Sequence, residues 1–513
     1  MSEKIATTAK IDVAVLKVAA VVVLGSIMSI LDITVVNVAL PTFQIEFGTV
    51  DNPVSYSHVA WTVTAYTLAL ATVIPMTGWA ADRFGTKRLY LIALLLFTLG
   101  SILSATATTI NGLILFRVIQ GLGGGMLMPL GMTILTRAAG PARIGRVMAI
   151  MGIPMLLGPI GGPILGGWLI DFASWHWVFL INAPIGLFAM FLAWKFLASD
   201  NPQPSESFDL VGMLMMSPGL AFFLFGVSSL PAKEGDFTEP RVWVSMTVGL
   251  ALIISFAFYS FKPKHPLLDL RLFKNRRLAI SVITLFMFAG AFFGALLLLP
   301  SYYQQVRGES VLTAGLMVIP QGLGAMITMP IAGMLVDRFP VGRIVPFGIA
   351  LIAGGMFPLT TLTHETEYIY IVAALFVMGL GMGLTMMPLT TSALKTLKNH
   401  DVARGSTLVN ITQQVASSVG ISIVSVLLTS SLKDSKTALP AIASWMDPNL
   451  ANQLGPEMVA MGLSEAADAF ASTIMVAWFM VVLTLIPALL LPKKREESHL
   501  LDPEDVPPAQ MMH

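Results

Sequence analysis

The sequence predicts an all-α membrane protein that consists of two six-helix halves with two further helices inserted between them. Three observations support this fold class. Hydrophobic residues make up 55% of the 513 residues and charged residues only 12%, far below the roughly one quarter typical of soluble domains. Apolar segments of membrane-spanning length recur along the chain. A motif that ends one such segment returns at the end of a later one, as expected for an internal duplication.

Fourteen segments contain the roughly 20 mostly apolar residues that a membrane-spanning helix needs. The first apolar stretch continues to Pro41 without a small-residue cleavage site, so we interpret it as an uncleaved span and not as a signal peptide. The predicted spans are 14–40, 59–81, 89–108, 111–136, 144–170, 177–198, 209–230, 242–261, 278–303, 312–336, 343–362, 368–394, 403–430 and 469–491.

The basic residues orient these spans. If the first span starts inside, 24 of the 30 lysines and arginines fall in tails and loops on the same side, 5 fall on the other side, and Arg117 lies within a span. The positive-inside rule makes that side cytoplasmic, so both termini are predicted to be cytoplasmic in a multi-pass protein of the cell (plasma or inner) membrane. The charges are dispersed and the net charge is +1, which indicates no nucleic-acid partner.

The repeated motif Pro-x-x-Gly-x-x-x-Asp-Arg-Phe occupies residues 75–84 and 330–339. Its copies end the second and tenth spans, whereas two adjacent six-span halves would place them in the second and eighth. The predicted domains are therefore a first half at 1–200, a two-helix insert at 201–265 and a second half at 266–494 with an external loop at 431–468. The polar tail at 495–513 is expected to be disordered.

Asp32 and Arg117 are the two ionisable residues that lie well inside predicted spans. A charge at the bilayer centre costs roughly 2.5–3.5 kcal/mol on insertion scales, so such residues are candidates for function. Both lie roughly 10–12 Å below the outer surface at about 1.5 Å per residue, which allows contact between them. One interpretation is a static ion pair. The other is that Asp32 carries protons, because burial favours a neutral carboxyl group and a nearby cation favours the charged one.

The fifth span is rich in glycine and proline: Gly158, Pro159, Gly162, Pro163 and Gly166. Proline kinks a helix, and glycines four residues apart form a smooth packing face. We consider both a hinge and ordinary tight packing. The glycines that follow Gln120 are not a dinucleotide-binding loop, since no strand precedes them.

The repeated motif is predicted to form a cytoplasmic gate. An aspartate at the C-terminal end of its own helix is unfavourable, so each is expected to find a partner in the other half, near Arg404 to Ser406 for Asp82 and near Gly145 and Arg146 for Asp337. The alternative is a simple topology anchor. The gate residues are Gly78, Asp82, Arg83, Gly85, Lys87, Arg88, Gly333, Asp337 and Arg338.

Polar side chains inside spans are candidates for a central cavity, or else for hydrogen bonds between helices. The abundant Met and Phe residues suit varied apolar ligands. The absence of cysteine excludes disulfides and thiolate metal sites, and no metal or cofactor is expected beyond a proton gradient. The cavity candidates are Asn37, Gln120, Asn182, Gln304, Asn410 and Gln413.

Together these residues resemble the major facilitator superfamily, specifically its fourteen-span drug:proton antiporter branch of EmrB- and QacA-like multidrug exporters. The segments that carry the resemblance are Leu31-Asp32-x-Thr34 to Pro41, Gly78-x-x-Ala81-Asp82-Arg83-x-Gly85-x-Lys87-Arg88, Arg117-x-x-Gln120-Gly121-x-Gly123, Gly158-Pro159-x-x-Gly162-Pro163-x-x-Gly166 and Trp175-x-Trp177 to Gly186. Two departures are His176, where the family often has Arg, and Pro340-Val341, inserted before Gly342.

The resemblance implies efflux of hydrophobic, often cationic, small compounds by alternating access, coupled to inward proton flow through Asp32 and Arg117. It also implies a lipid-bilayer environment, and some relatives export through a periplasmic adaptor. Because fold does not fix substrate, a lipid or narrow-substrate transporter is an alternative. A membrane enzyme or a non-transporting sensor is a further one. No H-E-x-x-H or matched Ser-His pair supports an enzyme, and the tails are expected to be too short for a signalling domain.

Overall fold

The computed structural model describes residues 12–48, 54–139, 143–199, 207–231, 235–395, 397, 401–445 and 448–493. These residues form helices and connecting turns without any strand. Thirteen helical segments among them are long and apolar enough to cross a membrane, and α6 (Ile144–Phe172) adds another 29-residue helix that packs along α1. The predicted all-α membrane fold is therefore confirmed. The tail at 495–513 lies outside the described residues.

The first half contains α1 (Val13–Glu46), the short α2 (Tyr56–Val59), α3 (Trp61–Phe84), α4 (Thr86–Ala105), α5 (Ile110–Ala139), α6, α7 (His176–Leu180) and α8 (Asn182–Phe196). The inserted pair is α9 (Leu210–Ser229) and α10 (Pro240–Tyr259). The second half contains α11 (Arg276–Leu296), α12 (Leu298–Gln305), α13 (Val311–Met317), α14 (Ile319–Arg338), α15 (Val341–Met356), α16 (Tyr368–Lys395), α17 (Val402–Asp434), α18 (Ala438–Ala443), α19 (Pro448–Leu454), α20 (Pro456–Leu483) and α21 (Leu485–Leu489).

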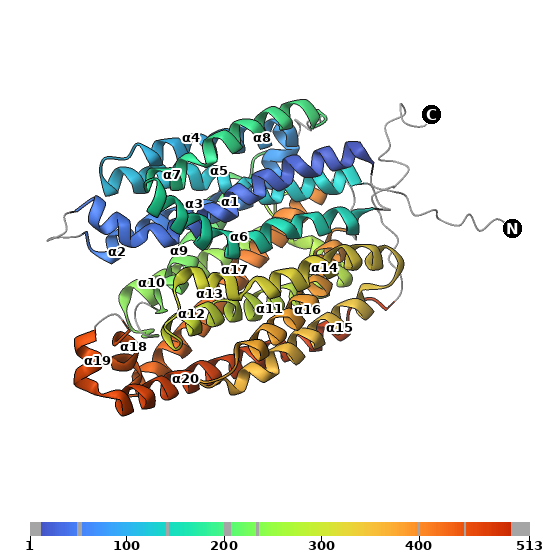
Figure 1. Cartoon of the computed structure of the whole chain (residues 1–513). Helices are drawn as coiled ribbons and strands as arrows, with labels where there is room; N and C mark the ends of the chain where they lie inside the picture. The colour runs from blue at the N-terminus through green and yellow to red at the C-terminus, as the bar shows by residue number, and fades with distance from the viewer. Residues whose placement is uncertain are drawn as a thin grey trace.

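The helices form two bundles that lie side by side (Figure 1). Helices α1 to α8 pack mainly against one another, and so do α11 to α21. The bundles meet where α3 packs against α17 and where α14 packs against α6. Because each of these pairs joins a motif-bearing helix of one half to a helix of the other, the interface has the pseudo-symmetry that the repeat predicts.

The inserted helix α9 runs along α3 and also touches α17. Phe208, just before α9, lies 4.4 Å from Trp79 between ring centroids, and Phe225 lies 5.5 Å from Trp61. The Ser422 hydroxyl of α17 donates a hydrogen bond to the Val227 carbonyl at 2.7 Å. The insert thus covers one side of the junction between the halves. Helix α10 packs on α9, and only Val242, Gly249 and Phe256 of α10 are buried.

The external loop predicted at 431–468 is shorter than expected. Helix α17 continues to Asp434 and α20 begins at Pro456, so the connection covers 435–455 and contains α18 and α19. Polar residues such as Glu465 lower the local hydropathy, on which the prediction relied, but they do not end a helix, because a helix can continue into water. Trp445 of this connection donates to the Gln305 carbonyl at 3.2 Å and covers Gly308.

Gly85 makes the turn between α3 and α4 possible. Its φ of 87° with ψ of 144° is a conformation that is essentially restricted to glycine. Gly85→Ala is expected to lower the free energy of unfolding by roughly 1–3 kcal/mol through backbone strain. The control is Gly354→Ala in α15, where an added Cβ meets nothing within 4 Å. Thermal unfolding in detergent checks this, and equal melting temperatures for the two variants would contradict it.

Candidate functional site

Asp32 of α1 and Arg117 of α5 form an ion pair inside the first half. The Arg117 Nη1 atom lies 2.5 Å from Asp32 Oδ2, and neither side chain is exposed. The contact that their matching depths allowed is therefore present. Since both charges are removed from water, each depends on the other and on further hydrogen bonds.

The second carboxylate oxygen of Asp32 binds two amides. Gln120 Nε2 donates to Oδ1 at 2.7 Å and Asn182 Nδ2 at 3.3 Å. Asn182 also donates to Ser101 Oγ of α4 at 3.1 Å. Gln120 and Asn182, which we predicted as cavity residues, thus belong to this buried network. Among the described residues, each of the three groups that hydrogen-bond the carboxyl group donates to it.

Arg117 is fixed by contacts of its own. Its Nε donates to the Thr62 carbonyl of α3 at 3.1 Å and its Nη1 to Gln120 Oε1 at 2.7 Å. The guanidinium lies 4.1 Å from the ring centroid of Tyr66, a favourable cation–π contact. Its Nη2 has no hydrogen-bond partner among the described residues. The pair therefore keeps one donor available for rearrangement.

Tyr66 and Ser29 connect this network to a cavity between the halves. The Tyr66 hydroxyl lies 3.1 Å from Ser29 Oγ, and Ser29 lines a cavity of about 230 Å³. Gly124 makes room for them, since a Cβ there would lie 2.5 Å from the Tyr66 hydroxyl. The sequence analysis missed Tyr66 and Ser29. Each is a polar residue within an apolar span, which is the criterion that selected the other cavity candidates.

The cavity has apolar walls with amides on one side. Asn410 and Gln413 of α17 line it as predicted, together with Ile30, Ile33, Phe293 and Met128. Gln413 Nε2 is buried without a hydrogen-bond partner among the described residues. A second cavity of about 290 Å³ adjoins it through Gln414 and Ser417 and reaches α9 at Leu224 and Ser228. The residues that line the two cavities include no charged side chain.

Two predicted cavity residues lie elsewhere. Asn37 is on an exposed side of α1, and Gln304 Nε2 donates to the Pro300 carbonyl of its own helix at 3.2 Å. Neither lines the two cavities. Spans that are apolar on every side give no indication of which face is turned inward, so the assignment of Asn37 and Gln304 to a central cavity stays a prediction.

The glycines of α6 let α1 approach closely. A Cβ added at Gly158 would collide with Ile30, and one at Gly162 with Thr34; Gly166 faces Val35. Thr34 Oγ1 donates to the Gly158 carbonyl at 3.0 Å. These contacts are close packing, and a hinge stays a prediction. The side chains of Pro159 and Pro163 lie outside the described residues.

The two repeated motifs lie at the end of the bundles that the basic loop residues predict to be cytoplasmic, which is called the basic end below. At this end, the glycine of each motif contacts the other half. A Cβ on Gly78 would lie 3.0 Å from Thr407 Oγ1 and 3.3 Å from the Ala403 carbonyl of α17. A Cβ on Gly333 would lie 2.7 Å from the Gly145 carbonyl of α6. These are the two helix N-termini that the sequence predicted as neighbours. The basic end of the interface is therefore closed.

The charged residues of the motifs are placed less symmetrically. Asp82 Oδ1 accepts from Arg137 Nη2 of its own half at 3.4 Å, a partner that the sequence analysis did not propose. α5 extends beyond the predicted span and so brings Arg137 to this level. Lys87 Nζ donates to the Trp194 carbonyl at 2.7 Å. Arg83 is half-buried, Arg88 and Arg338 are exposed, and the Asp337 side chain lies outside the described residues.

The sequence profile of the Major Facilitator Superfamily matches residues 22–421. The chain belongs to this superfamily. It is 47% identical over 504 residues to the "Multidrug resistance protein B homolog" of Mycobacterium tuberculosis, covering 96% of this chain and 92% of the relative. It is 32% identical over 404 residues to the "Multidrug export protein EmrB" of Haemophilus influenzae, covering 78% of each.

Solved structures show the same superfamily fold. The human organic anion transporter MFSD10 superposes with a TM-score of 0.60 at 15% identity, covering 91% of this chain and 99% of the other. The proton:xylose symporter XylE gives 0.54 at 16% identity, covering 91% and 94%. Family and fold together indicate a multi-pass membrane transporter and not an enzyme.

The glycine face of α6 offers a matched test of how α1 is held. Gly162→Ala is expected to push Thr34 and α1 away and to lower the free energy of unfolding by about 1–3 kcal/mol, as overpacking does. Gly167→Ala, five residues further along α6, meets nothing within 4 Å and should leave stability unchanged. Melting temperatures of the purified proteins check this. A Gly167→Ala variant as unstable as Gly162→Ala would contradict the assignment.

Proposed function

We propose that this chain is a multidrug efflux antiporter that exports hydrophobic small molecules in exchange for protons carried by Asp32. The observation that carries the proposal is the buried Asp32 network, which Tyr66 and Ser29 link to a cavity between the halves. The multidrug resistance and export names of the relatives support the substrate class. The driving force is the proton gradient, without a bound cofactor.

Protonation of Asp32 changes the network because its neighbours are all donors. A carboxylate accepts from Arg117, Gln120 and Asn182 together. A protonated carboxyl group has a hydrogen to donate, and the three N–H groups that contact Asp32 offer no acceptor for it, so the network has to rearrange around the new O–H group. Arg117 lies on the Tyr66 ring, and Tyr66 reaches Ser29 in the cavity wall. Proton binding can therefore alter the surface that a substrate meets.

Helix α1 connects this chemistry to the closed basic end. It carries Asp32 and packs on the glycine face of α6, and α6 in turn packs against Gly333 of α14. A shift of α1 on protonation would move α6 against the second half. In alternating access, this shift would open the contacts of Gly78 and Gly333, which are closed in this structure.

The cavity favours uncharged or weakly charged amphiphiles. Its walls are aliphatic and aromatic, and its polar groups are amides and hydroxyls such as Gln413 and Ser417. Asp32 is fully buried behind Ser29, so a cationic compound would not meet its carboxylate directly. A lipid or narrow-substrate transporter could use the same walls, and dye export by intact cells distinguishes these from a multidrug exporter.

Asp32→Asn is expected to abolish gradient-driven export of an uncharged hydrophobic dye such as Nile red, since an amide cannot take up and release the proton. Asp12→Asn is the control: Asp12 is an exposed acid that caps the same helix, and asparagine caps equally well. Export from energised cells with and without an uncoupler is the measurement. Size-exclusion profiles confirm that both variants fold. Full-rate uphill export by Asp32→Asn would refute the proton-carrier role.

Gln413→Ala is expected to change substrate affinity several-fold while export stays proton-driven. Gln413 lines the cavity, its Nε2 has no hydrogen-bond partner among the described residues, and one hydrogen bond is worth about 0.5–1.5 kcal/mol. Gln304→Ala removes an amide that lines neither cavity and serves as the control. KM values for two chemically different dyes check this. Identical KM values in Gln413→Ala and wild type would exclude the site.

The absence of native cysteine permits a direct test of alternating access. Cysteines at Gly78 and Thr407, whose Cβ and Oγ1 positions are 3.0 Å apart, should form a disulfide that holds the basic end closed. Transport should fall on oxidation and recover with reductant, while the single-cysteine variants should not respond to oxidant. Unimpaired transport by the quantitatively cross-linked protein would contradict alternating access through this gate.

A further inference from the structure

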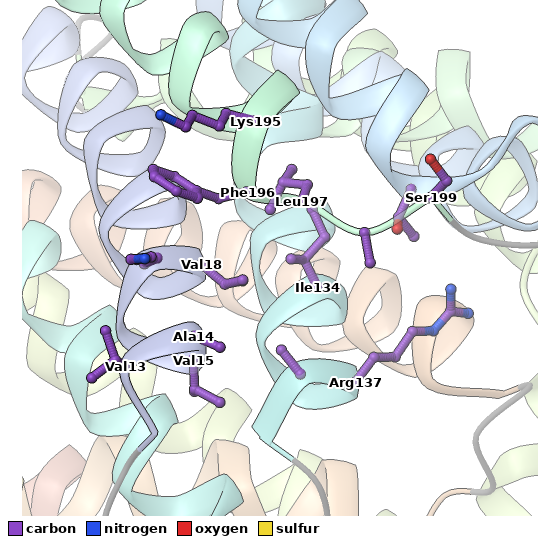
Figure 2. Close-up of a pocket in the computed structure, with 14 residues that line it drawn as sticks. Val13, Ala14, Val15, Val18, Ile134, Arg137, Lys195, Phe196, Leu197 and Ser199 are labelled. Atoms are coloured by element: carbon purple, nitrogen blue, oxygen red, sulfur yellow. The ribbon is translucent and has the colours of Figure 1, made fainter. Parts of the chain in front are cut away.

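A hollow distinct from the central cavity opens at the basic end of the first half. It has a volume of about 670 Å³ and lies between the start of α1, the end of α5 and the end of α8. Figure 2 shows side chains from these three elements around it. Much of its wall is apolar and includes Val15, Val18, Ile134, Phe196 and Leu197. This composition suits an apolar chain better than a water-soluble ion.

Among the described residues, three cations and no acid line this hollow: Lys17, Lys195 and Arg137. The Lys17 ammonium lies 5.2 Å and the Lys195 ammonium 5.6 Å from the centroid of the same Phe196 ring. Neither lysine has a hydrogen bond or ion pair with a described residue. The Lys195 ammonium also lies 5.8 Å from the centroid of the Phe191 ring. Like charges in one neighbourhood repel each other, and an anion bound near both would offset that cost.

Arg137 contributes less free charge than the lysines. Its Nη2 donates to Asp82 at 3.4 Å, so part of its charge is already balanced. Asp12, the acid nearest to Lys17 in sequence, accepts a hydrogen bond from the Ala14 amide at the start of α1. The uncompensated charge of the hollow is therefore that of Lys17 and Lys195.

We propose that this hollow binds an anionic phospholipid of the inner leaflet, with the headgroup phosphate held near Lys17 and Lys195 and an acyl chain along the apolar wall. Basic pockets between membrane helices on the cytoplasmic side suit such headgroups. Ordinary interfacial lysines extend to the lipid surface without any enclosed space. Here the two ammonium groups lie near one ring beside a half-open, mostly apolar hollow, which matches the two parts of a lipid.

The site has a consequence for the first half. Its walls come from α1, α5 and α8, the same three helices that carry Asp32, Arg117 with Gln120, and Asn182. A lipid bound there would hold these helices together at their basic ends. It would thereby stabilise the arrangement that the buried network requires.

The test measures lipid binding to the purified full-length chain after delipidation in detergent, by native mass spectrometry. The probes are phosphatidylglycerol, phosphatidylcholine with the same acyl chains, and inorganic phosphate as a competitor. Lys17→Gln/Lys195→Gln should bind phosphatidylglycerol about 30-fold more weakly, because each lysine near an anionic lipid contributes roughly fivefold. Lys262→Gln/Lys264→Gln, which removes two exposed lysines of the α10–α11 connection, should bind like wild type. Lys17→Arg/Lys195→Arg should also retain binding.

The outcomes separate the possible ligands. Preference for phosphatidylglycerol over phosphatidylcholine, lost only in the Lys17→Gln/Lys195→Gln variant, supports the proposal. Equal binding of the two lipids by wild type overturns it, and so does equal loss in both glutamine variants. Displacement of phosphatidylglycerol by inorganic phosphate at equal concentration would overturn the lipid assignment in favour of a soluble anion.

Discussion

The burial of one carboxylate against one guanidinium constrains most of the first half. Removing one partner of such a pair typically costs 3–5 kcal/mol because the other charge stays buried. The Asp32–Arg117 pair is completed by Gln120 and Asn182 and by the Thr62 carbonyl. These groups come from α1, α3, α5 and α8. The relative positions of four helices thus depend on satisfying a single ion pair.

Glycine allows these helices to come close enough. Gly124 leaves room for the Tyr66 hydroxyl beside Ser29, and Gly158 and Gly162 let α6 lie against α1. On its other side α6 meets Gly333 of α14. The same kind of contact therefore links the buried pair to the cavity and to the opposite half. Small residues are the usual means of close helix packing in a membrane, where apolar burial alone gives little discrimination.

The sequence predicted the spans and the buried pair because both depend on depth along the chain. Counting residues along an apolar span from the predicted membrane surface estimates how deep each residue lies. This estimate put Asp32 and Arg117 at similar depths, and the two side chains are in contact. The estimate does not give helix rotation. Ser29 faces the cavity and Asn37 is exposed, although both are polar residues of the same apolar helix. Tyr66 and the Arg137 partner of Asp82 were missed for this reason and because helix ends extend beyond the hydrocarbon region.

The halves share one fold but differ in chemistry. The first half carries the buried ion pair, while α17 of the second supplies the amides of the cavity. The most direct test of the coupling between them is proton release on substrate binding, measured with a pH indicator in weakly buffered detergent solution. The account predicts saturable release from wild type and none from Asp32→Asn. Absence of release from substrate-saturated wild type, or equal release from both proteins, would contradict it.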